Sequence, residues 1–274
     1  MGQQNSAYLA SDVRNLYIGK GRLYFGRFDD NGVNTGELDL GNATSIQLTM
    51  NYTSKEHFTS RRGIKELDQA IDIDKKFGLK FDLEEYSVEN LRLAVRGDNN
   101  NWNDQAYEVQ TAGTSTNQAF TARQDRWVDL GKRSILASPA IVLKNSASVT
   151  MTEGYDYIID HVSGRVKVTY DGRVYDKEAC TITYSYSSVK QPKILTSEDT
   201  KVEGFCRFIG DQTYGPSLEV QVWKAKIWCT SGIQLISDDY SKLSFEGTIF
   251  SMYDSHPTEP FFKILNPKAT TIIS

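Results

Sequence analysis

The sequence predicts a mainly β protein built from two domains, and three observations carry this prediction. It contains 15 tyrosines and 12 phenylalanines beside many valines, isoleucines and threonines, which are the residue types enriched in strands. Most apolar runs are short and alternate with polar residues. Turn dipeptides recur between them, at Asn31-Gly32, Ser163-Gly164, Asp171-Gly172 and Ser231-Gly232.

The first strands are expected at 22–28 and 44–52, around a hairpin rich in Gly, Asn and Asp. A polar N-terminal extension at 1–22 precedes them. In the second strand one face carries Ile46, Leu48, Met50 and Tyr52. Residues 53–69 lose the alternation and carry many charges. They are therefore interpreted as a long loop, and long loops in compact domains are usually functional or disordered.

Residues 70–83 alternate again and predict a strand. The apolar face would hold Ile71, Ile73, Phe77, Leu79, Phe81 and Leu83. The polar face would hold Asp72, Asp74, Lys76, Lys80 and Asp82. A helix should follow, with Ser87 as its N-cap, an apolar stripe of Val88, Leu91 and Val95, and Gly97 at its end.

The middle of the chain is most simply an inserted β domain. A small-residue linker at 111–121 and a polar linker at 189–200 flank strands between 122 and 188, including a hairpin at 155–170. Strands of the first type then resume at 202–210, 218–229 and 241–253. The expected domains are thus a discontinuous one, 1–112 with 192–274, and an insertion, 113–191.

Charge and cysteine usage narrow the function classes. The formal net charge is −4; the insertion carries +2 and the remainder −6, whereas proteins that clamp DNA through its phosphates are normally basic. No run of about 18 apolar residues predicts a membrane helix, and no secretory signal is expected. Three cysteines without a CxxC motif suggest a reduced protein with neither a disulfide framework nor a zinc site.

No catalytic or metal motif stands out. The three histidines, His57, His161 and His256, lie about a hundred residues apart and none has metal-ligand spacing. Asp72 and Asp74 could hold a cation, but alternating acids on a strand are more often solvated. The sequence therefore predicts no enzyme, no cofactor and no metal.

Several short motifs, in a specific order, resemble those of the tail tube (major tail) proteins of long-tailed bacteriophages. They are Leu40-Gly41-Asn42, Lys55-Glu56-His57, Asp68 before an alternating strand, Glu89-Asn90-Leu91, Gly204, Gly210-Asp211 and Gly215-Pro216. The segment EGYDYIIDHVSGRVKV is similar to the small Ig-like β-sandwich insertions of some of these proteins.

The resemblance implies a β-sandwich protomer with one flanking helix. Six protomers would form a ring whose inner strands make a β-barrel, and rings would stack into the tube that conducts the genome into the host. The partners would be further copies of the chain, a tape-measure protein, and tail terminator and baseplate proteins. The protein would be assembled in the host cytoplasm and reside in the virion tail.

Two sets of residues are candidates for this role. A negatively charged wall would let DNA pass without binding it. The candidate lumen-lining residues are Asp72, Asp74, Asp82, Glu203 and Glu246. The candidate contacts between subunits or rings, in the 53–69 loop, are Lys55, Glu56, Arg61, Arg62, Lys65 and Glu66. The insertion is expected to project outward, to be dispensable for polymerisation and to make weak contacts with host-surface glycans.

Three alternatives stay open. One is another phage ring protein, from a baseplate, a terminator or the inner tube of a contractile tail. Another is a glycan-binding β-sandwich adhesin, for which the 15 tyrosines and the insertion speak. The last is a hydrolase with paired carboxylates, for which only the Asp72–Asp74 spacing speaks.

Overall fold

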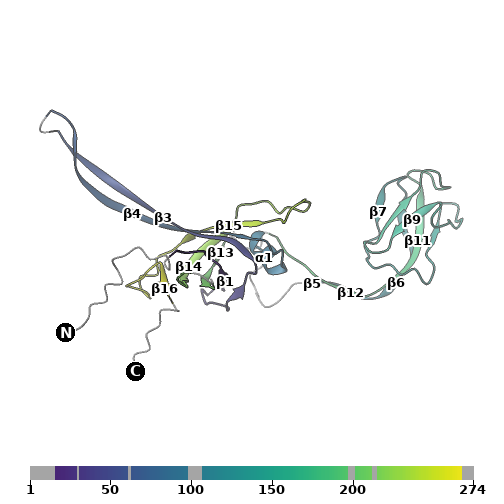
Figure 1. Cartoon of the computed structure of the whole chain (residues 1–274). Helices are drawn as coiled ribbons and strands as arrows, with labels where there is room; N and C mark the ends of the chain where they lie inside the picture. Colours follow the sequence, from purple (N-terminus) through teal and green to yellow (C-terminus); the bar gives the residue numbers. More distant parts are fainter. Residues whose placement is uncertain are drawn as a thin grey trace, which may run out of the picture. The chain divides into compact units, whose positions relative to one another are not determined.

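The computed structural model describes residues 16–29, 31–60, 63–97, 107–196, 201–211 and 215–266 (Figure 1). The chain divides into two compact units, the first formed by 1–104 with 194–274 and the second by 105–193. Expected boundaries of 113–191 therefore fall inside the second unit, which begins eight residues earlier and ends two later. No helix among the described residues is long and apolar enough to cross a membrane.

An eight-stranded antiparallel sheet makes up most of the first unit. Its order is β2-β1-β13-β14-β15-β4-β3, and β16 pairs with β14 beside β15. The strands are β1 (Gly21–Arg27), β2 (Leu38–Asp39), β3 (Ala43–Thr59), β4 (Glu66–Leu83), β13 (Val202–Gly210), β14 (Glu219–Cys229), β15 (Leu243–Ile249) and β16 (Phe262–Leu265). The described sheet has two ends, the short strand β2 and the 17-residue strand β3.

One face of this sheet forms the core of the first unit. Alternate residues of β4, namely Leu79, Phe81 and Leu83, are buried there, and Phe81 stacks on Phe245 of β15 with ring centroids 5.0 Å apart. The alternation expected for 70–83 is therefore confirmed in its second half. Mainly β structure with antiparallel sheets follows from this pattern, because each strand buries one face and leaves the other in solvent.

Helix α1 (Val88–Ala94) is short and capped as expected. The Ser87 side-chain oxygen accepts a hydrogen bond from the Asn90 backbone N–H at 3.1 Å. The face that it buries differs from the expected stripe, because Leu93 and the polar Asn90 and Arg92 are the buried residues and Val95 is the C-cap. In the interior the Asn90 Nδ2 donates to the carbonyls of Leu40 and Glu85, whereas its Oδ1 accepts no hydrogen bond from the described residues.

The second unit contains two three-stranded sheets, β7-β10-β9 and β6-β11-β8, that contribute to one apolar core. A separate ladder pairs β5 with β12. The strands are β5 (Tyr107–Gln110), β6 (Gly113–Thr121), β7 (Trp127–Asp129), β8 (Val142–Lys144), β9 (Tyr157–Asp160), β10 (Arg165–Val168), β11 (Ala179–Tyr186) and β12 (Val189–Pro192). The two sheets and their shared core make this unit a small β-sandwich.

The hairpin expected at 155–170 is present as β9 and β10. Gly164 turns between them at φ +72°, and a Cβ there would collide with the Lys132 carbonyl oxygen. The expected linker 111–121 is wrong in most of its length, because Gly113–Thr121 is the strand β6. Its small residues hide the strand pattern, but pairing with β11 supplies the backbone hydrogen bonds.

An ion pair between a buried carboxylate and a half-exposed arginine holds one loop of the second unit in place. Asp156 is fully buried and accepts hydrogen bonds from the backbone N–H groups of Thr152 and Arg173 at 2.7 and 2.9 Å. The Arg173 guanidinium donates to the same two carboxylate oxygens, from Nε to Oδ1 at 3.1 Å and from Nη2 to Oδ2 at 2.5 Å. These bonds hold the pKa of the Asp156 carboxyl well below its usual range, so it remains charged in the interior.

Candidate assembly surfaces

The expected loop at 53–69 is instead the outer part of a long β-hairpin. Strand β3 continues to Thr59 and β4 begins at Glu66, and the two stay paired along this length. We call the paired segments 51–59 and 66–76 the arm (Figure 1). None of its residues is buried, so no core imposes alternation on the sequence, which explains why 53–69 does not have the pattern of a strand.

The arm exposes large apolar side chains. Phe58 and Leu67 lie opposite each other across the two strands and are 48% and 54% exposed. Nearer its root, Tyr52, Ile71 and Ile73 are also more than half exposed. A two-stranded ribbon is marginally stable by itself in water, and clustered exposed apolar groups are typical of a contact surface.

Along the arm, two β-bulges in β4, opposite Thr53/Ser54 and opposite His57/Phe58, change the face to which the following side chains belong. One lies between Thr53 and Ser54, where the register passes from Asp74 directly to Asp72. Directly opposed residues share a face, so Asp74 lies with Thr53 and Asp72 lies with Ser54 on the opposite face; the Ser54 hydroxyl donates to Asp72 at 2.6 Å. The expectation that Asp72 and Asp74 share one polar face is therefore wrong.

The other four candidate lumen residues lie on one face of the sheet, opposite the core. The registers place Glu246 beside Lys80 of β4 and Trp228 of β14, and Glu203 beside Lys226. Asp74 and Asp82 are an even number of residues from Lys80, so they share its face. This polar face also carries many lysines.

These acids are largely neutralised by neighbouring cations. Ion pairs join Lys76 to Asp74 at 3.0 Å and Lys80 to Glu246 at 2.6 Å. Glu203 lies 2.9 Å from Lys224 and 3.3 Å from Lys201. The polar face is therefore of mixed charge, which agrees with the lysines expected on it and not with a wall of carboxylates alone.

The candidate contact residues Lys55, Glu56, Lys65 and Glu66, on the arm or next to it, are exposed, and none of them takes part in an ion pair among the described residues. Arg61 and Arg62 lie outside the described residues. The one charged contact along the outer arm is between the His57 ring Nδ1 and the Asp68 carboxylate, 2.5 Å apart, within the part of the chain that is described.

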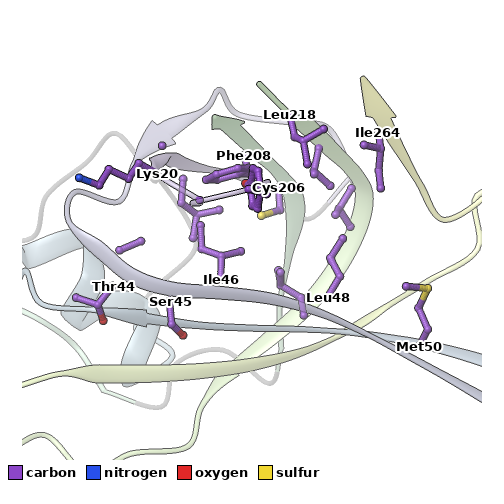
Figure 2. A pocket seen from close by; sticks show the side chains of 18 residues that line it. Lys20, Thr44, Ser45, Ile46, Leu48, Met50, Cys206, Phe208, Leu218 and Ile264 are labelled. Atoms are coloured by element: carbon purple, nitrogen blue, oxygen red, sulfur yellow. The ribbon is translucent and has the colours of Figure 1, made fainter. Parts of the chain in front are cut away.

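An apolar groove of about 390 Å³ lies where the sheet curls on itself (Figure 2). Ile46 and Leu48 of β3 form one wall, and Phe208 and Leu218 lie across from them. Burial raises the pKa of the Cys206 thiol at its floor to about 12, so this sulfur stays protonated. Lys20 is the only charged side chain among the described residues that line the groove, which suits apolar contact better than acid–base chemistry.

A second exposed apolar segment joins β14 to β15, at residues 230–242. Leu235, Ile236 and Tyr240 are 87%, 92% and 84% exposed. The described hydrogen bonds from its base join Thr230 and Ser231 to Ser244. The sequence pattern indicates only the Ser231-Gly232 turn in this segment; three large apolar residues within six positions of a polar loop are a signal that alternation does not register.

The chain matches a family described as "Protein of unknown function UCP028589" over residues 16–259. The match takes in both units. No curated protein matches the chain.

Proposed function

The chain belongs to the family described as protein of unknown function UCP028589, and from its exposed surfaces we propose that it is a structural subunit that assembles with copies of itself into stacked rings forming a tube. The tube would be the tail tube of a long-tailed bacteriophage. The arm carries this proposal, because its length and exposed apolar residues have no use within one subunit.

The sheet edges support self-association. Strand β3 is the end strand of the described sheet and is 17 residues long. Long exposed edges are a liability for a soluble monomer, and closure into a ring of subunits removes them. The arm then has a natural place as an extension that reaches a neighbouring subunit or ring.

The charge distribution supports a passive conduit, in a modified form. The second unit holds 11 basic and 9 acidic residues, which leaves 20 basic and 26 acidic residues and a charge of −6 for the first. The polar face that includes Asp74, Asp82, Glu203 and Glu246 nevertheless pairs most of its acids with lysines. A wall of this kind would avoid holding phosphates because its cations are already occupied, with repulsion as a smaller effect.

Negative-stain microscopy of the purified full-length chain, together with light scattering over a range of concentrations, tests this proposal. Rings or tubes are the expected result, alone or with tape-measure and baseplate partners. A monomer at every concentration, with no tubes beside these partners, would overturn it. The number of copies per particle distinguishes a tube from a baseplate or terminator ring.

One observation favours a binding role for the second unit. Trp127 of β7 is exposed, and the cations of Arg165 and Lys167 on β10 lie 5.3 and 5.4 Å from its ring centroid. We propose that this face makes the weak glycan contact expected of the insertion. Binding to a glycan array that Trp127→Ala abolishes would support it, and unchanged binding would contradict it.

A further inference from the structure

Exposed apolar side chains occur at both ends of the β14-β15-β4-β3 part of the sheet. The arm tip presents Phe58 and Leu67 at one end. The β14–β15 loop presents Leu235, Ile236 and Tyr240. The registers fix this loop at the opposite end, because Leu243, the first residue of β15, pairs with Leu83, the last residue of β4.

The arm of a subunit cannot reach the β14–β15 loop of the same subunit. The 18 residues of β4 separate them. At about 3.3 Å per residue this is roughly 60 Å. Figure 1 shows the arm and the β14–β15 loop leaving the sheet in opposite directions. Any contact between them must therefore join two copies of the chain.

The charges of the two segments are complementary. In sequence, residues 55–66 contain four basic side chains against two acids, Glu56 and Glu66; of the four, Lys55 and Lys65 are described, and Arg61 and Arg62 lie outside the described residues. The loop carries Asp238 and Asp239, and its lysine, Lys242, lies 3.6 Å from Glu84. Opposite charges around an apolar centre favour a specific orientation of the contact.

We propose that the β14–β15 loop of one subunit is the docking site for the arm tip of the next. Leu235, Ile236 and Tyr240 would pack against Phe58 and Leu67, and Asp238 and Asp239 would lie within reach of Lys55 and Lys65. The proposal rests on the proposed self-assembly and names the contact that extends it. Because the two surfaces differ and lie at opposite ends, the contact propagates head to tail and gives a filament, as stacking requires.

Two variants and a control test this contact in the full-length protein. The loop variant is Leu235→Asp with Ile236→Asp, and the arm variant is Phe58→Thr with Leu67→Thr, which keeps residues compatible with a strand. The control is Val162→Asp, a residue of the second unit that is 80% exposed. Sedimentation velocity over a concentration series should show that each variant needs at least about tenfold more protein to form long assemblies, whereas the control behaves as the wild type.

Mixing the variants distinguishes arm-to-loop contact from contacts between like surfaces. The arm variant keeps an intact loop and the loop variant keeps an intact arm, so a mixture can form one such contact between the two species. We expect the largest species in the mixture to have twice the mass of the largest species that either variant forms alone. No larger species should appear. Unchanged circular dichroism and urea midpoints show that all variants are folded.

The outcomes separate the two proposals. If the loop variant assembles as the wild type does, or if mixing produces no doubling, the docking site is wrong although self-assembly stands. A wild type that never associates overturns self-assembly itself.

Discussion

The two halves of the β3–β4 hairpin have the same backbone structure and opposite surroundings. At the root, Leu79, Phe81 and Leu83 face a core and their neighbours face solvent. Along the arm both faces are exposed. Apolar, acidic and basic residues are interspersed on them. The difference teaches that alternation records one-sided burial and not strand formation as such, so a ribbon exposed on both faces can lack a periodic signal, as it does over 53–69.

The largest contrast should come from truncating one aromatic residue in each half. Phe81→Ala at the root removes a buried ring that stacks on Phe245, and we expect a loss of about 3–5 kcal/mol in the free energy of unfolding. Urea denaturation of the monomeric protein measures it. A loss below about 1 kcal/mol would mean that the root is not packed as described.

A second contrast concerns acids, one buried in the second unit and one exposed on the arm. The folded pKa of Asp156 is lowered by Arg173 and backbone donors, so its stabilisation is present above about pH 4 and is lost as pH falls below that value. Asp156→Asn should destabilise the second unit by about 1–2 kcal/mol at pH 7, because the amide cannot accept all the hydrogen bonds of the buried carboxylate, while the half-exposed Arg173 stays solvated.

Amide exchange of β9 and β10 at pH 7 and near pH 3 checks this. The difference in amide protection of β9 and β10 between the wild type and Asp156→Asn should be smaller at the lower pH. Asp72→Asn on the arm serves as control and should change neither value; an equal effect of both variants would contradict the assigned role of Asp156.

A smaller contrast compares two serine hydroxyls. Ser87 caps α1, and Ser87→Ala should cost about 1 kcal/mol. Ser54 on the arm donates to the exposed Asp72, so Ser54→Ala should stay within about 0.5 kcal/mol. Urea midpoints of the two variants, measured below the assembly concentration, should therefore differ in this order, and the reverse order would refute the capping role.

The smallest effect on the monomer is expected from Phe58→Ala, at most about 0.5 kcal/mol, because the ring has no core to leave. Its consequence should appear in the assembled state. Amide exchange of residues 53–58 should be fast in the monomer and slow in the assembly, and Phe58→Ala should weaken that protection. Equal protection of the arm in monomer and assembly would show that it makes no contact with a neighbour.

The sequence sufficed where local chemistry decides the structure. Ser87 followed by an apolar turn predicted α1, and alternation around Ser163-Gly164 predicted the β9–β10 hairpin. The boundaries of the insertion also lie near the positions that composition indicated. The strands there were not predicted, because β5 falls at the expected end of the first domain and β6 in the expected linker.

The rest depended on information that one sequence does not hold. The bulge opposite Thr53 and Ser54 leaves Ile73 unpaired and shifts every later side chain to the other face. Its position is fixed by the strand register, not by composition. The pairing of Glu246 with Lys80 joins residues 166 positions apart, so a count of charges along the chain could not find it. The exposed Leu235 and Ile236 follow no periodicity at all.

The β5–β12 ladder has a consequence for how the second unit could be exchanged. Its register, from Tyr107 opposite Pro192 to Gln110 opposite Val189, brings the outgoing and returning chain within about 5 Å of each other. A two-residue turn could close this gap, and so could any module whose own termini are adjacent. The ladder is thus a point at which a whole module could be gained, lost or replaced without a change in the sequence of the first unit's sheet.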